Sequence, residues 1–228
     1  MVASEDGACE SCAVVTTSET RMEKTAETMR IVRPSAHRTM PWKNGGGTTT
    51  EIAIDPPGID VNGRFRWRLS IADVERSGPF SAFPGYERTI MVIAGRGMEL
   101  AVGDQPSRRL DRPFEPFMFS GDSAADCRLI GGPIRDFNLM VERSLLRSHL
   151  AVVSLDGAPR LFGLTSGELI IHCFDGAIEI APRQGAPAVT LQENCTAIVN
   201  SAGNDRDSVR LSAPSVSAKA AIIQLTPI

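Results

Sequence analysis

The chain has 228 residues, of which 42% are hydrophobic and 22% are charged, with 24 Lys and Arg against 27 Asp and Glu. A formal charge of −3 excludes a general polyanion binder, because phosphate contacts need a surplus of cations, and we expect no nucleic-acid partner. No apolar run is long enough to span a membrane, and the first residues do not resemble a signal peptide. We therefore expect a cytoplasmic protein without a membrane partner.

Residues 1–28 are rich in Thr, Ser, Glu and Ala and contain few bulky apolar side chains. Such a composition cannot bury enough apolar surface to offset the entropy of ordering the chain. The sequence therefore predicts a disordered N-terminal tail over this segment.

From residue 29 onward, short segments typical of strands alternate with turns. Residues 49–54 alternate and stop at the sequence DPPG, residues 64–71 alternate, and residues 89–94 form an apolar run that ends at Gly95. Period-2 alternation and turn signals at this spacing indicate an all-β fold.

The second half of the chain repeats the plan of the first. Residues 93–95 find their counterpart in residues 174–176, 81 positions later, and the same offset relates Leu110 to Leu191. A repeat of this length is too long for a solenoid unit and suits a small double-sheet domain. We expect two jelly-roll-like β-barrel domains, residues 29–145 with a candidate ligand pocket and residues 146–228, and an exchange of C-terminal strands between them stays open.

Four segments in fixed order carry a family resemblance. They are residues 40–52 (MPWKNGGGTTTEI), 65–72 (FRWRLSIA), 78–88 (GPFSAFPGYER) and 136–140 (DFNLM). In this order and spacing the chain resembles the HutD/Ves family. The resemblance implies a tandem cupin (bicupin) fold, a cytoplasmic protein and an association with histidine utilisation.

Many cupins hold a divalent cation with histidines and a carboxylate. This chain has only His37, His149 and His172, and no two of them show the spacing of metal ligands. We therefore expect a metal-independent cupin with no cofactor.

The glycine-rich segment after Pro41 is the first candidate for ligand binding. Lys43 supplies a cation, Asn44 a donor and an acceptor, and Trp42 a flat apolar wall, while Gly45 and Gly46 let the backbone approach a ligand closely. Such a set is suited to clamping a small carboxylate. The alternative is a tight glycine turn that leads into the next strand, with Trp42 as a plug.

The alternating segment 64–71 places Phe65, Trp67, Leu69 and Ile71 on one face and three arginines with a serine on the other. Arginines without partners cannot fill a packed core, so this face is either solvated or lines a polar pocket. If Arg68 and Ser70 point inward, they form an anion site, because the planar guanidinium donates two parallel hydrogen bonds to a carboxylate. Strand register decides between the two.

The remaining candidates lie on two later strands. The stretch from Phe80 to Arg88 lies where cupins carry their metal ligands, and its part from Phe83 to Arg88 is a candidate for the pocket wall. Glu87 and Arg88 must point to opposite faces of a strand. Glu87 is a candidate general base without an identified acid partner. Asp136 and Asn138 share a face and add polar groups, or they form an ordinary strand edge.

These features support a protein that binds a small carboxylated metabolite and has a regulatory role. The family resemblance implies a ligand from histidine breakdown, such as urocanate or a formylated glutamate. The alternative is a metal-free cupin enzyme, an isomerase or hydrolase, that uses Glu87 with Arg88 or Lys43. The exposed sheet edges of such folds leave open an oligomeric scaffold such as a homodimer.

Overall fold

The computed structural model describes residues 28–164, 166–182, 187–201, 208–214 and 217–228. These residues form nineteen strands and one three-residue 3-10 turn, η1 (Pro34–Ala36), which confirms the all-β class. No helix among them is long and apolar enough to cross a membrane. The expected N-terminal tail lies outside the described residues up to position 27, and Thr28 already begins a strand.

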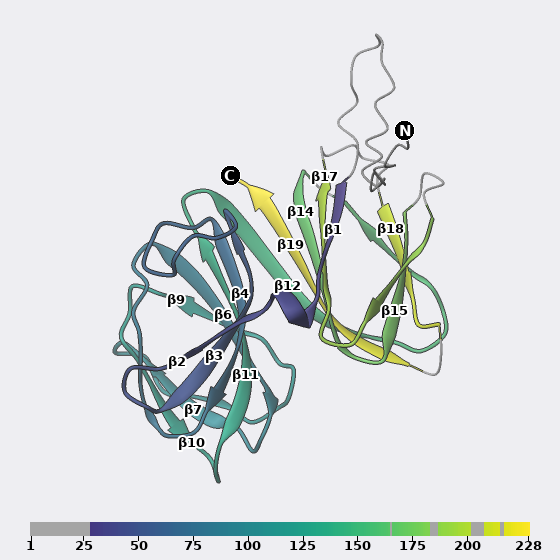
Figure 1. The fold of residues 1–228 in the computed structure, drawn as a ribbon. Coiled ribbons are helices and arrows are strands. Elements are labelled where there is room, and N and C mark those ends of the chain that lie inside the picture. The colour runs from purple at the N-terminus through teal and green to yellow at the C-terminus, as the bar shows by residue number, and fades with distance from the viewer. Residues whose placement is uncertain (1–27, 165, 183–186, 202–207, 215–216) are drawn as a thin grey trace, which may run out of the picture.

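The first half of the chain consists of two sheets (Figure 1). The six-stranded sheet has the order β2-β3-β4-β11-β6-β9, and the four-stranded sheet has the order β5-β10-β7-β8. The strands are β2 (Arg38–Pro41), β3 (Gly47–Asp55), β4 (Trp67–Val74), β5 (Gly78–Phe80), β6 (Tyr86–Ala94), β7 (Met98–Val102), β8 (Arg108–Leu110), β9 (Phe117–Ser120), β10 (Ala125–Leu129) and β11 (Ile134–Glu142).

The second half also consists of two sheets. A five-stranded sheet has the order β1-β17-β14-β19-β12, and a four-stranded sheet has the order β13-β18-β15-β16. The strands are β1 (Thr28–Val32), β12 (Leu146–Leu155), β13 (Arg160–Gly163), β14 (Gly167–Asp175), β15 (Ala177–Pro182), β16 (Val189–Gln192), β17 (Thr196–Ser201), β18 (Ser208–Ser212) and β19 (Ala218–Pro227).

Strand β1 lies in the sheet of the second half, although it precedes the first half in sequence. Its residues pair antiparallel with β17, from Thr28 opposite Asn200 to Val32 opposite Thr196. Met29 and Ile31 pack against the core of the second half, because alternate side chains of a strand share a face. The first domain was expected to begin at residue 29, whereas β1, which contains this residue, forms an edge of the five-stranded sheet of the other half.

The two halves share one strand order, as the sequence repeat predicts. Strands β4-β11-β6-β9 of the first half correspond to β12-β19-β14-β17 of the second, and β5-β10-β7-β8 to β13-β18-β15-β16. The matched turns after β6 and β14 contain Gly95 and Gly176, which both have positive φ and leave no room for a Cβ. No sheet closes on itself among the described residues, so each half is a pair of separate sheets rather than one closed barrel.

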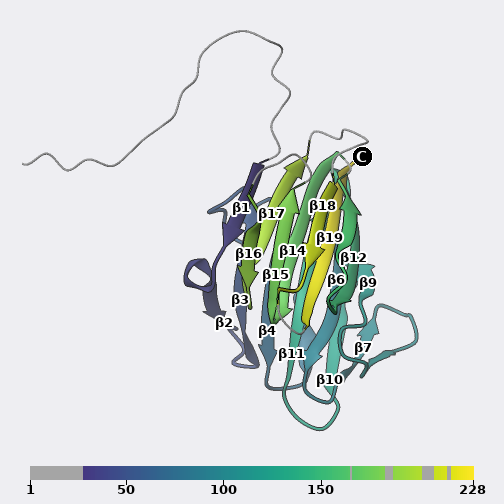
Figure 2. The same cartoon turned by 90° about the vertical axis from the view of Figure 1, so that its right-hand side faces the viewer.

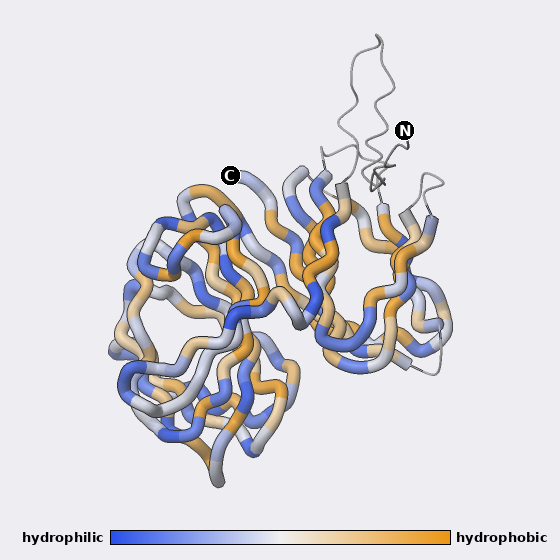
Figure 3. The backbone as a smooth tube through the Cα atoms, viewed as in Figure 1, coloured by the Kyte–Doolittle hydropathy of each residue, from blue (hydrophilic) through white to orange (hydrophobic). Residues whose placement is uncertain are grey.

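The two large sheets pack face to face across an apolar layer (Figures 1 and 2). Trp67 and Leu69 of β4 and Phe137 of β11 meet Ile170 of β14 and Ile223 of β19 in one buried cluster. Burial of each such side chain stabilises the fold by about 1.5–3 kcal/mol. In Figure 3, apolar stretches of both halves, coloured orange, lie where the two halves meet. This layer occupies one face of the six-stranded sheet, so the other face points into the first half.

Strand β4 therefore has the two environments that its alternation indicates. Trp67 and Leu69 lie in the layer between the halves, with Ile71 packed against it. Phe65 differs from the expectation, because it precedes β4 and packs with Ile54 and other residues in a separate cluster. The alternation is broken where the backbone N–H of Arg66 donates to Asp55 O, one residue before regular pairing begins.

Candidate functional site

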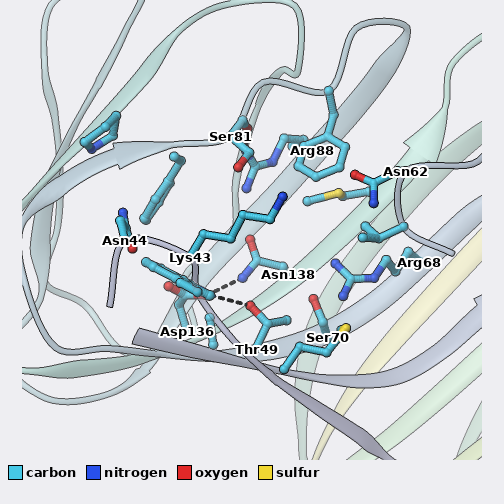
Figure 4. A pocket seen from close by; sticks show the side chains of 18 of the residues that line it. Lys43, Asn44, Thr49, Asn62, Arg68, Ser70, Ser81, Arg88, Asp136 and Asn138 are labelled. Atoms are coloured by element: carbon cyan, nitrogen blue, oxygen red, sulfur yellow. Dashed lines mark hydrogen bonds between the residues drawn. The ribbon is translucent and has the colours of Figure 1, made fainter. Parts of the chain in front are cut away.

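A pocket of about 440 Å³ lies in the first half, lined by residues of β2, β3, β4, β5, β6 and β11 and by the loops that follow β2, β3 and β5 (Figure 4). Its wall contains nine of the twelve residues that the sequence nominates: Trp42, Lys43, Asn44, Arg68, Ser70, Phe83, Arg88, Asp136 and Asn138. Gly45, Gly46 and Glu87 do not line it.

Arg68 projects from β4 on the face opposite Trp67 and is buried. Its Nε donates to Glu51 Oε2 of β3 at 2.7 Å, and Glu51 Oε1 lies 3.2 Å from Arg38 Nη2. The ion pair holds the guanidinium at its Nε side. No hydrogen bond involves the two Nη atoms of Arg68 within the part of the chain that the structure describes, so its end remains free to bind an anion.

Arg88 projects inward from β6 and is buried among aromatic rings. Its guanidinium carbon lies 5.0 Å from the centroid of Phe119 and 5.6 Å from that of Phe83. Nη1 donates to Ser81 O at 3.0 Å, whereas Nε has no hydrogen-bond partner among the described residues. Burial lowers the pKa of Arg88 to about 10, because removal from water disfavours the charged form, so the side chain stays cationic at neutral pH.

Asp136 and Asn138 project into the same pocket from β11, on alternate positions as a strand requires. Asn138 Nδ2 donates to Asp136 Oδ1, and Asp136 Oδ2 has no partner within the described ranges. Burial raises the pKa of Asp136 to about 7, against the lowering effects of the Asn138 hydrogen bond and the Arg88 charge. The carboxyl is therefore poised between its two protonation states near neutral pH.

Ser70 and Lys43 complete the polar wall. Ser70 lies directly opposite Asn138 in the pairing of β4 with β11, and both side chains line the pocket. Lys43 comes from the loop after β2 and extends across the pocket in Figure 4. No ion pair involves Lys43 among the residues that the structure describes. Lys43, Arg68 and Arg88 thus give the wall three cations against the single acid Asp136.

The glycine loop (residues 42–47) shapes one side of the pocket but binds its own backbone. Gly45 N–H donates to Trp42 O and Gly46 N–H to Asn44 Oδ1, at 3.0 and 2.9 Å. Trp42 Nε1 donates to Thr49 Oγ1 at 2.8 Å, which fixes the indole in the pocket wall. The two glycine N–H groups are therefore engaged within the turn, and the side chains of the loop face the pocket.

Glu87 lies on the opposite face of β6 from Arg88, as neighbouring residues of a strand must. Its Oε1 accepts a hydrogen bond from Ser148 Oγ of β12 at 3.1 Å. The candidate general base thus contacts the second half and does not reach the pocket.

The second half does not repeat the polar wall. The position equivalent to Arg88 is Leu169 on β14, 81 residues later, and the pairing of β19 with β14 makes Ala220 and Ile222 equivalent to Asp136 and Asn138. All three lie in the apolar core of that half. The two halves therefore share an architecture but differ in the chemistry of their inner faces.

The donor set of the pocket does not suit a divalent cation. Its lining side chains include one carboxylate and no histidine or cysteine. Across the described residues, no group of three or more His, Cys, Asp or Glu side chains is arranged to hold a metal ion.

The sequence missed Glu51, which orients Arg68, and Ser81, whose carbonyl oxygen binds Arg88. A signal for Glu51 exists, because it stands at the start of an otherwise apolar strand stretch where a charge needs a partner. Ser81 acts through its backbone, so no side-chain pattern identifies it.

Two solved structures that are more than 35% identical to this chain match most of it. A conserved protein of unknown function from Pseudomonas aeruginosa is 37% identical and superposes with a TM-score of 0.80, covering 87% of this chain and 99% of its own. HutD from Pseudomonas fluorescens SBW25 is 36% identical with a TM-score of 0.73, covering 88% and 100%. Oxalate decarboxylase from Bacillus subtilis, only 7% identical, has a TM-score of 0.66 over 90% of this chain and 79% of its own, which shows that the fold is cupin-like.

Comparison of sequences points to the same group of relatives as the HutD structure. An uncharacterised 21.2 kDa protein in the 3′ region of hutC from Pseudomonas putida is 49% identical over 142 residues, which are 62% of this chain and 72% of the relative. The family model described as HutD matches residues 34–218. This match extends over both halves and includes every residue of the pocket, so the chain belongs to the HutD family.

Proposed function

We propose that this protein is a metal-independent bicupin whose first half binds a small carboxylated metabolite. The observation that carries the proposal is the convergence of Lys43, Arg68 and Arg88 on one pocket of about 440 Å³. That volume lies within the range of about 300–1,000 Å³ that is usual for small-molecule sites. The shared strand order of the two halves supports the bicupin assignment.

The chemistry of the wall favours an anion such as a carboxylate over neutral ligands. Arg68 is held through Nε by Glu51, and the end of a planar guanidinium matches the two oxygens of a carboxylate. Arg88 is desolvated, so its attraction for an anion is screened less than that of a surface arginine. A charge-assisted hydrogen bond of this kind contributes about 1.5–3 kcal/mol.

The proposal extends to a regulatory role in histidine utilisation. It rests on two relatives, the protein named HutD and the protein encoded in the hutC 3′ region. Urocanate and N-formylglutamate, carboxylates of histidine breakdown, are the first ligands to test. A cytoplasmic location and a homodimer stay predictions.

The enzymatic alternative is not proposed, because its candidate base lies elsewhere. Glu87 does not line the pocket and bonds to Ser148 of β12. An isomerase or hydrolase in this pocket would need a different base.

Isothermal titration calorimetry with urocanate, N-formylglutamate and glutarate tests the proposal. We expect at least one acid to bind, and we expect Lys43→Ala to weaken that binding about tenfold or more through the loss of one charge-assisted contact. Lys43 has no ion-pair partner in the described ranges and is exposed, so its removal leaves the fold intact. The matched control is Arg147→Ala, an exposed cation on β12 of the other half.

Arg68→Met is a second probe, with thermal unfolding measured alongside because Glu51 loses a partner. Binding that is lost in Lys43→Ala and kept in Arg147→Ala supports the pocket. The absence of binding by all three acids, or equal affinity in Lys43→Ala and the wild type, contradicts it.

A further inference from the structure

One carboxyl oxygen of Asp136 is buried without a hydrogen-bond partner in the described part of the chain, and the fold gives no reason for it. Oδ1 accepts a hydrogen bond from Asn138, whereas Oδ2 is buried and has no partner among the described residues. A buried polar atom without a partner costs about 1–3 kcal/mol, and more when it is charged. Native structures keep such an atom rarely, and a role in binding is one reason to keep it.

The groups around Asp136 determine whether its carboxyl is protonated or ionised when a ligand binds. No ion pair joins Asp136 to a cation within the part of the chain that the structure describes. The charged and titratable groups that face the carboxyl or act on it come from every element around it: Arg88 on β6, Arg68 and Asp73 on β4, Cys127 on β10 and Lys43 from the glycine loop.

Two effects oppose ionisation of Asp136, and together they outweigh the Asn138 hydrogen bond and the charge of Arg88. Burial is the largest effect and Asp73 adds to it, so the pKa of Asp136 lies at about 7 despite Arg88 and Asn138. A carboxylate that enters between Lys43, Arg68 and Arg88 brings a negative charge close to Asp136. Like charges at short range disfavour ionisation further, so the occupied pocket favours the protonated acid.

We propose that Asp136 takes up one proton from solvent when a carboxylate binds in the pocket, and that its Oδ2–H donates a hydrogen bond to the ligand. This inference rests on the proposed function. Oδ1 keeps its bond from Asn138, so the proton resides on the oxygen that otherwise lacks a partner. Hydrogen bonds from a carboxylic acid to a carboxylate are short and charge-assisted, which offsets the cost of taking up the proton.

Proton uptake by Asp136 makes the affinity for a carboxylate ligand fall as the pH rises. The ligand carboxylates keep their charge above pH 6, so only the protein group titrates. If only the protonated form of Asp136 binds and its pKa is about 7, the affinity falls roughly a hundredfold between pH 6 and pH 9. Arg88, with a pKa of about 10, stays mostly charged over this range.

Calorimetric titration with N-formylglutamate, with glutarate as a second probe, measures the affinity at each pH and the number of protons taken up on binding. Runs in buffers of different ionisation enthalpy give the number of protons taken up, expected near 0.5 per ligand at about pH 7 and near 1 at about pH 8.5. Asp136→Asn places a neutral N–H donor at the same position. We expect it to keep the wild-type affinity at pH 6 within about threefold and to lose most of the pH dependence.

Asp111→Asn is the matched control, because Asp111 is exposed, pairs with Arg109, lies outside the pocket wall and is not among the groups that shift the pKa of Asp136. It should keep the pH dependence. Circular dichroism confirms that each variant is folded, and if Asp136→Asn is not, the proton count of the wild type decides alone.

The outcomes separate the inference from the proposed function. If a probe binds the wild type with equal affinity at pH 6 and 9 and without proton uptake, the inference is overturned while the binding site stands. Affinity that rises with pH, with no binding by folded Asp136→Asn, also overturns it, because the ionised carboxylate would then accept a ligand N–H. If no carboxylate binds at any pH, the binding function itself fails, and the inference fails with it.

Discussion

His172 makes the stability of this protein sensitive to acid. The side chain lies on β14 between the two halves, fully buried, with its ring 5.2 Å from Phe137 and 4.8 Å from Phe174. Nδ1 is 2.8 Å from Thr196 Oγ1, and Nε2 has no partner among the described residues. Burial, with a smaller contribution from His37, lowers the pKa of His172 from 6.5 to about 3.

The folded pKa lies below the unfolded value, so protonation favours the unfolded chain. The contribution of His172 to stability is fully present above about pH 6.5 and is lost progressively as the pH falls towards 3. Each pH unit within this window costs about 1.4 kcal/mol, so the loss at pH 5 is about 2 kcal/mol. This loss is a large fraction of the free energy of unfolding, which is only about 5–15 kcal/mol for most single domains.

Urea unfolding at about pH 7 and pH 5 measures this loss. His172→Gln removes the titration, so we expect the free energy of unfolding to fall by about 2 kcal/mol less in the variant than in the wild type. The control His149→Gln, an exposed histidine on β12, should behave as the wild type. Equal losses in the wild type and His172→Gln would refute the reasoning, because the carboxylates are the same in both.

Two further predictions concern stability. Trp67→Phe removes the donor to Glu168 Oε2, 2.7 Å away across the two halves, and should lower the free energy of unfolding by about 1–3 kcal/mol in urea titrations. No change would show that water replaces the indole. Gly95→Ala should lower the melting temperature more than Gly132→Ala, because both have positive φ but only the first Cβ would meet backbone, Pro133 O at 2.6 Å. Equal shifts would contradict this.

The alternation of β4 predicted two environments, and the structure has both. The sequence did not show which face of β4 lines the cavity. The apolar face with Trp67 and Leu69 packs against the sheet of the other half, which leaves the face with Arg68 to line the pocket. That contact joins residues about a hundred positions apart, as Trp67 and Glu168 do. Local periodicity contains no information on such a partner, so Arg68 stayed undecided between solvent and pocket.

The same limit applies to Glu87 and Arg88. Adjacency on a strand required one of them to face inward. The choice depends on the register of β6 between β11 and β9, which places Arg88 opposite Met140 and Phe119. Register is set by long-range pairing and not by the two residues themselves. By contrast, the conformation of the glycine loop depends mainly on its own residues. The tight turn that the sequence offered as one interpretation matches the hydrogen bonds inside the loop.

The comparison between the halves gives the strongest support for placing the proposed binding site in the first half. At equivalent positions the second half has Leu169 and Ala220 where the first has Arg88 and Asp136. The apolar pair shows that this architecture folds around hydrocarbon, so the buried charges are not needed to form the sheets. Burying a guanidinium and a carboxyl without a mutual ion pair destabilises the folded state. Proteins keep such destabilising groups mainly where function requires them, and here they face a pocket of about 440 Å³, next to Lys43 and Arg68.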